Sequence, residues 1–251
     1  MPEAEFKPIS YSAPPITEAV IGISFASPID QKKIDTVNTR FKINYPNHQL
    51  VSNYGVAVNI PMGNGNQPTT NINKENGYRH SSLDMTQLLV LWQSSFIVSQ
   101  LAPYKGWEHF FSRFVSDWNI WKKTIGFQTI QRIGVRFINR IDIPVKDSSV
   151  SHEEFLNVYP KLPANLDPID AYAVQASMRF PDIDCVLRIN SAAVPSPILD
   201  HIAFVIDIDI SREVNPPQND EEIFDILNAI RIKKNEVFES CVSDRARELF
   251  K

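Results

Sequence analysis

The chain has 251 residues, of which 43% are hydrophobic and 22% are charged, and its 25 basic and 29 acidic residues give a net charge of −4. This composition allows a sizeable core and excludes a disordered tail. The acidic balance argues against a generic, charge-driven nucleic-acid binder. No Gly-Lys-Ser/Thr follows the Gly63-Asn64-Gly65 turn, which argues against a phosphate loop.

Targeting signals and disulfides are not predicted. The N-terminal residues contain no apolar core flanked by basic residues, as a signal peptide would. The longest apolar run is far shorter than the ~20 residues that span a bilayer. The two cysteines, Cys185 and Cys241, form neither a CxxC pair nor a disulfide framework. We therefore expect a cytoplasmic protein with no membrane partner.

The first half of the chain predicts one strand, one helix and then further strands. A strand is expected over 18–26, followed by a helix capped by Asp30 with Ile34, Val37 and Phe41 on one face. Strand patterns return over 51–60, 78–84, 86–93 and 95–101, whereas residues 63–76 are polar without a period and predict a loop.

An aromatic helix is predicted from about Lys105 onward. Its aromatic side chains recur at helical spacing, and the members expected to be structural are Trp107, Phe111, Phe114 and Trp118. Such a stripe is more often core than a ligand-binding surface, so we expect it to pack against a sheet. Each buried indole N–H needs a partner, which places some members at the edge of the core.

The second half predicts a long strand, several shorter strands and a final helix. The long strand covers 128–143, and strands follow over 172–180, 185–190 and 202–210. The last helix has acidic residues at its start and Arg245 and Arg247 near its end, as the helix dipole favours. Its apolar face is expected to comprise Ile223, Ile226, Leu227, Ile230, Val237, Phe238 and Cys241.

The element order predicts an α+β fold with an antiparallel curved sheet, or sheets, backed by long helices. Residues 1–251 would form a single domain. The repetition of the pattern also allows two intimately packed, related β-α-β halves, residues 1–126 and 127–251.

Three arginines on one face of the long strand are the first candidate site. Arg132, Arg136 and Arg140 are spaced by four residues, so successive guanidinium groups lie about 13 Å apart along the strand. The guanidinium fork suits phosphate geometry, which predicts an anion-binding site for a phosphate-bearing ligand. Arg136, the middle residue, is expected to be the least exposed.

The alternative for these arginines is pairing within the protein. Residues 105–146 carry eight basic and three acidic residues, whereas residues 182–225 carry two basic and ten acidic. If the basic and acidic strands share a sheet, cross-strand ion pairs worth roughly 0.2–1 kcal/mol each would satisfy both.

Two carboxylates on the strand over 202–210 are the second candidate site. Asp207 and Asp209 point to one face and could bind Mg²⁺ through their oxygens, with Glu18 as a third ligand if its strand is adjacent. The alternative is that both pair with the arginines or face solvent. We expect no other cofactor.

Three motifs together resemble a known group of proteins. They are Pro14-Pro15-Ile16-Thr17-Glu18-Ala19-Val20, Tyr104-Lys105-Gly106-Trp107 and the segment Arg132-Ile133-Gly134-Val135-Arg136-Phe137-Ile138-Asn139-Arg140-Ile141. The chain resembles, over nearly its whole length, an uncharacterised family of sporadically distributed prokaryotic proteins of similar length. Such a distribution implies genes carried in mobile defence or toxin–antitoxin islands. The family has a histidine where this chain has Asn228.

Three functions remain open at this point. The first is a non-enzymatic binding or regulatory protein with a protein partner encoded nearby, or one that forms a homodimer. The second is a phosphate- or nucleotide-handling enzyme that uses a metal at Asp207 and Asp209 together with the arginine strand. The third, nucleic-acid binding without sequence preference, is less favoured by the charge.

Overall fold

The nine strands that the structure describes form one antiparallel sheet. The computed structural model describes residues 9–59, 69–145, 150–163, 165 and 171–251. The strand order is β2-β3-β4-β5-β1-β6-β9-β8-β7, and every neighbouring pair is antiparallel. Helices accompany this sheet, so the fold is α+β with an antiparallel sheet, as predicted.

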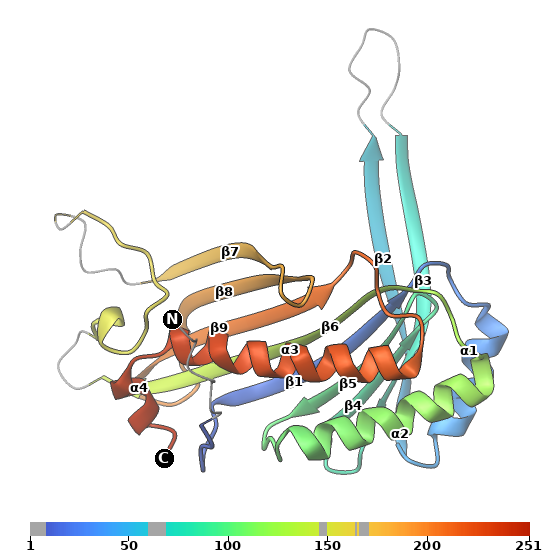
Figure 1. Ribbon diagram of the computed structural model, residues 1–251, viewed down its shortest axis with the longest axis horizontal. Helices are drawn as coiled ribbons and strands as arrows, with labels where there is room; N and C mark the ends of the chain where they lie inside the picture. The colour runs from blue at the N-terminus through green and yellow to red at the C-terminus, as the bar shows by residue number, and fades with distance from the viewer. Residues whose placement is uncertain (1–8, 60–68, 146–149, 164, 166–170) are drawn as a thin grey trace, which may run out of the picture.

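The chain builds the sheet in two passes, before and after helix α2 (Figure 1). The elements of the first pass are β1 (Ile16–Phe25), α1 (Gln31–Phe41), β2 (Asn47–Asn59), β3 (Thr69–Ser81), β4 (Gln87–Trp92), β5 (Ser95–Leu101) and α2 (Trp107–Ile125). The elements of the second pass are β6 (Ile130–Pro144), the 3-10 turn η1 (His152–Glu154), β7 (Tyr172–Phe180), β8 (Cys185–Pro195), β9 (His201–Arg212), α3 (Asp220–Cys241) and α4 (Asp244–Glu248).

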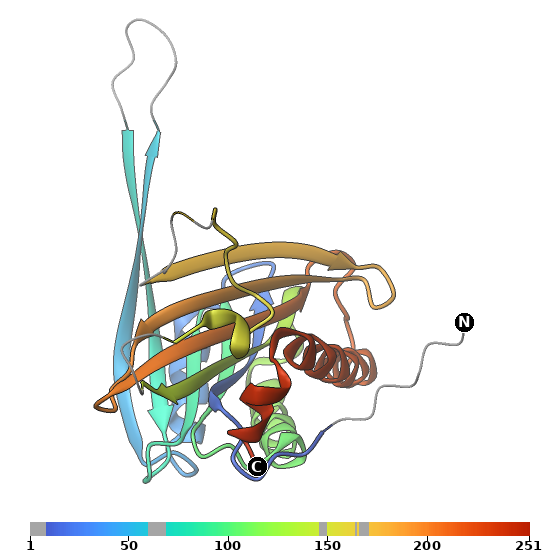
Figure 2. The same cartoon turned by 90° about the vertical axis from the view of Figure 1, so that its left-hand side faces the viewer.

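The sheet curves, and α2 and α3 lie on its concave side (Figure 2). Helix α3 contacts β6 and β9, while α1 contacts α2, β3 and β4. The strands alternate buried apolar residues with polar ones, so one face of the sheet meets the helices. The buried side chains form one hydrophobic cluster that includes Ile21, Val135, Phe137 and Ile208.

The aromatic stripe of α2 lies at the centre of this core. Trp107, Phe114 and Trp118 are buried, while Phe111 is half-buried and packs edge-to-face against Phe224 of α3. The indole N–H of Trp118 donates to Asp220 at 3.0 Å. The stripe therefore packs against both the sheet and α3, and not against the sheet alone.

Two expectations about secondary structure were wrong. Residues 69–76, predicted as part of a loop, belong to β3, whereas 63–68 lie outside the described residues. From Thr69 to Asn76, β3 pairs only with β2 in a two-stranded arm (Figure 1). A strand that packs against no core needs no alternation of apolar and polar residues, so the pattern gave no signal.

The second wrong expectation concerns the end of the chain, where the single helix that was predicted is two helices, α3 and α4. Val242 has an extended backbone and bridges to Leu156, and the Ser243 hydroxyl caps α4 by accepting from the Ala246 N–H. Arg245 and Arg247 therefore belong to α4, and the last turn of α3 holds no basic residue. In the described part of the chain, no helix is both long enough and apolar enough to cross a membrane.

The burial of Trp118 leads to a stability prediction. Its side chain is fully buried between Phe114 and Phe96. Trp118→Ala should lower the free energy of unfolding by about 3–5 kcal/mol, because a large cavity forms and the Asp220 carboxylate loses a donor. Urea denaturation measures this loss. As a control, Lys123→Ala on the exposed side of the same helix should change stability by no more than about 0.5 kcal/mol.

Candidate functional site

The arginines of β6 lie on the convex face of the sheet and meet carboxylates of β9. Strand β9 pairs with β6 in a register that places Arg136 opposite Asp209 and Ile138 opposite Asp207. The Arg132 guanidinium contacts both carboxylate oxygens of Asp209 at 2.9 and 2.7 Å, and reaches Glu213 at 3.4 Å. The basic and acidic segments are thus joined across one strand pair.

Arg136 makes a two-pronged ion pair with Asp207. Its Nε and Nη2 donate to the two carboxylate oxygens at 2.7 and 2.6 Å. Hydrogen bonding to this carboxylate raises the pKa of Arg136. The Asp207 carboxylate also accepts from Asn190 at 3.3 Å, and its side chain is only 11% exposed. Such a bidentate geometry is the strong form of an ion pair.

The expectation that Arg136 is the least exposed arginine was wrong. The Arg136 side chain is 49% exposed, compared with 30% for Arg132 and 37% for Arg140. Gly134 precedes it on the same face of β6 and pairs with Gly22 of β1. Neither glycine has a side chain that could cover the guanidinium. A Cβ at Gly134 would also lie 2.9 Å from the Ile210 carbonyl oxygen, so this close strand contact requires glycine.

Arg140, Asp207 and Asp209 on this face all have partners within the protein. The Arg140 Nε donates to Asp142 on its own strand at 3.0 Å, and Asp142 also accepts from Ser196 at 2.8 Å. Asp207 and Asp209 each hold a guanidinium group, and the charge of Glu18 acts on Arg136, whose pKa it helps to raise. Among the described residues, no three His, Cys, Asp or Glu side chains are grouped to hold a metal.

A pocket of about 470 Å³ lies on the opposite, helix-covered side, where α3 crosses β6. Segment 9–16, the turn 104–106 before α2, strand β6 and helix α3 all contribute to its walls. Its apolar walls include Tyr104, Phe137 and Phe238. Its size falls within the usual range for sites that bind small molecules.

Lys234 of α3 supplies the buried charge of this pocket. The residue is only 8% exposed, and its ammonium lies 3.8 Å from the centroid of the Phe137 ring. Within the described structure, no carboxylate lies within ion-pair distance of Lys234 and no hydrogen bond reaches its ammonium. Burial, together with the nearby charge of Arg231, lowers the pKa of Lys234 to about 7, and the charge of Glu239 acts in the opposite direction.

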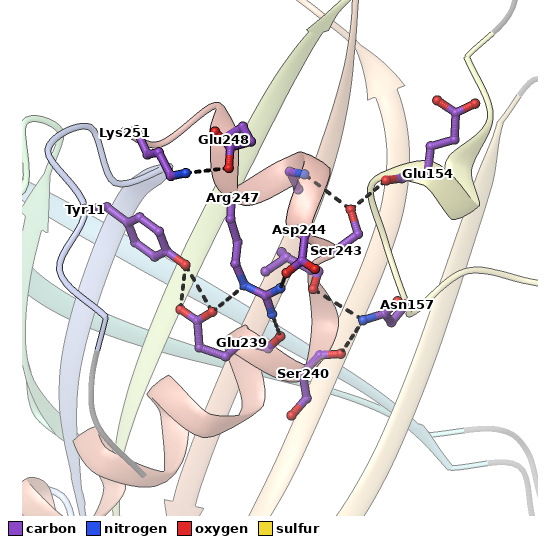
Figure 3. Close-up of polar contacts among 12 residues, drawn as sticks. Tyr11, Glu154, Asn157, Glu239, Ser240, Ser243, Asp244, Arg247, Glu248 and Lys251 are labelled. Atoms are coloured by element: carbon purple, nitrogen blue, oxygen red, sulfur yellow. Dashed lines mark hydrogen bonds and ion pairs between the residues drawn. The ribbon is translucent and has the colours of Figure 1, made fainter.

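The groups around Lys234 leave the pocket with an excess of positive charge. Arg231 lies one turn earlier on α3 and reaches the Glu108 carboxylate of α2 at 4.0 Å, and Lys105 contributes from the turn before α2. Glu239 is the acidic group of the lining, but its carboxylate pairs with Arg247 at 2.9 Å and accepts from the Tyr11 hydroxyl (Figure 3). Strand β6 contributes only neutral groups, Phe137 and Asn139.

The three motifs that carry the family resemblance meet at this pocket. The Pro15 carbonyl accepts from the Arg140 N–H at 2.8 Å, and the Thr17 hydroxyl donates to the Ile138 carbonyl at 3.0 Å. Gly106, the N-cap of α2, has a φ of 95°, a backbone conformation that favours glycine. The Trp107 indole then donates to Asn228 of α3 at 2.9 Å, which gives this asparagine a structural role.

Lys234 was missed in the sequence, although a signal was present. It lies four residues after Ile230 and four before Phe238, and so falls on the apolar face predicted for the last helix. A lysine in the middle of an apolar face is an exception that could have been noted. Its burial and lack of a partner, however, depend on β6 and segment 9–16, which the periodicity of the helix does not reveal.

Comparisons with known proteins give little further guidance. No model of a known protein family matches the chain, and no curated protein sequence matches it. Among solved structures, the chain is similar to DynU16, a protein from the dynemicin biosynthetic locus, with 10% identity and a TM-score of 0.24. The match covers 94% of this chain and 98% of that one.

The Arg136–Asp207 pair can be tested by mutation. Arg136→Gln should lower the free energy of unfolding by about 1–3 kcal/mol, because it leaves the mostly buried Asp207 carboxylate with Asn190 alone. Thermal and urea denaturation measure this change. Arg179→Gln on β7, where the arginine is exposed and unpaired, should have an effect below about 0.5 kcal/mol.

The anion-site alternative for Arg136 predicts the opposite pattern. Wild-type protein would then be stabilised by phosphate more than by chloride of equal ionic strength. Arg136→Gln would remove that difference without loss of stability.

The buried charge of Lys234 should lower the free energy of unfolding of the ligand-free protein. Its native pKa of about 7 lies below the usual 10.5, so between these pH values the unfolded chain binds a proton that the native chain does not. The free energy of unfolding should therefore rise from pH 7 toward 10.5. At pH 6, Lys234→Met should be equally stable or more stable by about 1–4 kcal/mol, as when buried charges are replaced by apolar groups.

Lys233→Met is the matched control for this experiment. Lys233 is the adjacent residue, but its ammonium pairs with Asp182 at 3.0 Å and Glu236 at 2.9 Å. This variant should be slightly less stable than wild type at pH 6. A clear loss of stability in Lys234→Met at pH 6 would contradict the unfavourable burial of Lys234.

Proposed function

We propose that this chain is a non-enzymatic binding protein whose ligand is a small organic anion with an apolar part, held in the pocket at Lys234. The observation that carries the proposal is the buried ammonium without a carboxylate partner. A carboxylate or phosphate group of a ligand would supply the missing counter-charge. The aromatic walls would contact the rest of the ligand.

The energetics favour a ligand over a purely structural role for this lysine. A cation over an aromatic ring is worth about 0.5–2 kcal/mol. The cost of moving an ammonium out of water is several kcal/mol even after the protein relaxes. Contact with Phe137 therefore offsets only part of the cost of burying Lys234, whereas an anion in the pocket would offset much more.

The polar groups of the pocket suit the head group of such a ligand. Ser10 and Ser12 of the N-terminal segment and Asn235 of α3 carry side chains that can donate to an anion, and Arg231 adds a guanidinium. The apolar part would lie against Tyr104, Phe137 and Phe238. The lining thus combines polar and aromatic groups, which suits a ligand with both a charged and an apolar part.

The resemblance to sporadically distributed prokaryotic proteins extends this proposal to regulation. In that extension, occupancy of the pocket controls binding to a protein partner encoded nearby, in a mobile defence or toxin–antitoxin system. Segment 9–16 lines the pocket and also contacts the end of the chain, where the Ala13 N–H donates to the Phe250 carbonyl at 3.0 Å. This surface would be the one that a ligand alters.

We also propose that the two passes of the chain are related halves, each backed by its own helix. Strand β1 pairs with β5 in the first pass, and β6 pairs with β9 in the second, so each opening strand pairs with the closing strand of its own half. Helix α2 follows β5 and α3 follows β9. The pairing of β1 with β6 would join the halves.

Anion binding can be measured with simple probes. Benzoate and phenyl phosphate should raise the melting temperature of the protein at pH 6, whereas neutral benzyl alcohol should not. The stabilisation should weaken as the pH rises through about 7, because Lys234 then loses its proton in the free protein. Titration calorimetry at pH 6 and 8.5 provides the affinities.

The lysine variants separate this site from others. Lys234→Met should reduce benzoate affinity at least about tenfold, the equivalent of losing one charge-assisted contact of ~1.4 kcal/mol. Lys233→Met should bind like wild type. Equal binding by both variants, or no binding by wild type, would refute the proposed site.

A further inference from the structure

We propose that Lys234 forms a covalent imine with 2-oxo acids that enter the pocket. The proposal rests on the proposed function, because the carboxylate of such a ligand would use the same anion site. Three observations carry it: Lys234 is buried in a pocket, its ammonium has no carboxylate partner, and other cations line the same walls. An amine in this setting is more readily deprotonated than an exposed lysine, and the neutral amine is the nucleophile.

The placement of the cations matches the two functional groups of a 2-oxo acid. Arg231 and Lys234 are three residues apart on α3, so both side chains lie on one face of the helix, with Cβ atoms ~5–6 Å apart. Lys105 faces the same space from the turn before α2. The carboxylate of a 2-oxo acid would pair with Arg231 or Lys105, which brings the adjacent carbonyl carbon to Lys234.

The chemistry needs no further reactant. The neutral Lys234 nitrogen attacks the carbonyl carbon, and the carbon–oxygen π electrons move to the oxygen, which takes up a proton. The resulting carbinolamine loses water: the two amine hydrogens leave with the former carbonyl oxygen, and a carbon–nitrogen double bond forms. Nothing is oxidised or reduced, and the reverse reaction with water releases the ligand unchanged.

The charged and titratable groups that face Lys234 are consistent with an amine that is partly neutral near pH 7. Arg231, which also reaches Glu108 at 4.0 Å, and Lys105 are cations. Glu239 pairs with Arg247, and its charge raises the pKa of Lys234 against the effects of burial and Arg231. Burial raises the pKa of Tyr104, and burial with the Glu239 hydrogen bond raises that of Tyr11 to about 12. Both phenols therefore remain neutral proton donors in the range where Lys234 titrates.

The imine can be trapped and located. Wild-type protein is incubated with phenylpyruvate at pH 7.5, reduced with sodium borohydride and examined by intact mass and peptide mapping. The expected result is one reduced adduct per chain, on Lys234, in wild type and in Lys233→Met. Lys234→Met should lose this adduct, and labelling of Lys234 should fall at least tenfold in the presence of excess benzoate. This competition uses wild-type protein and does not depend on the folding of a variant.

The outcomes distinguish this inference from the proposed function. If benzoate binds as proposed but phenylpyruvate yields no adduct, or one spread over surface lysines, the imine is refuted and the anion site stands. If neither benzoate nor phenylpyruvate binds, both fail. A trapped adduct on Lys234 that excess benzoate does not suppress would refute the shared site.

Discussion

Strand β6 has an apolar face that packs in the core and a charged face that pairs with β9, and the rest of the structure depends on this alternation. Every second side chain faces the core, where Val135 and Phe137 meet the helices. The side chains between them face outward, where Arg132 and Arg136 meet the carboxylates of β9. Because the period of a strand is two residues, a shift of register by one would bury the guanidinium groups and expose the apolar residues.

The two faces of the sheet differ in how their charged side chains are paired. On the convex face, each arginine of β6 has a carboxylate partner nearby, so the contrast between basic and acidic segments is resolved within the sheet. On the helix-covered face, the Lys234 ammonium is buried against Phe137 without such a partner. A buried charge that is left unpaired is the better candidate for function, because structural stability alone does not favour it.

The pocket around Lys234 is made from segments that are far apart in the chain. The N-terminal segment, the turn at Gly106, strand β6 and helix α3 meet there because β1 pairs with β6 and α3 crosses β6. The three motifs noted in the sequence thus share a location, and two of their glycines have a local physical reason. Gly106 has a positive φ, which favours glycine, and a Cβ at Gly134 would lie too close to the backbone of β9.

The sequence by itself determined the α+β class, most of the strands and the two faces of β6, because these depend on periodicity within one element. It placed Asp30 as the cap of α1 and Trp118 in the core for the same reason. Only the tertiary structure decided which strands pair, and hence that Arg136 meets Asp207 and that β3 continues into a polar arm. The burial of Lys234 was decided there too, because three distant segments together cover most of one side chain of α3.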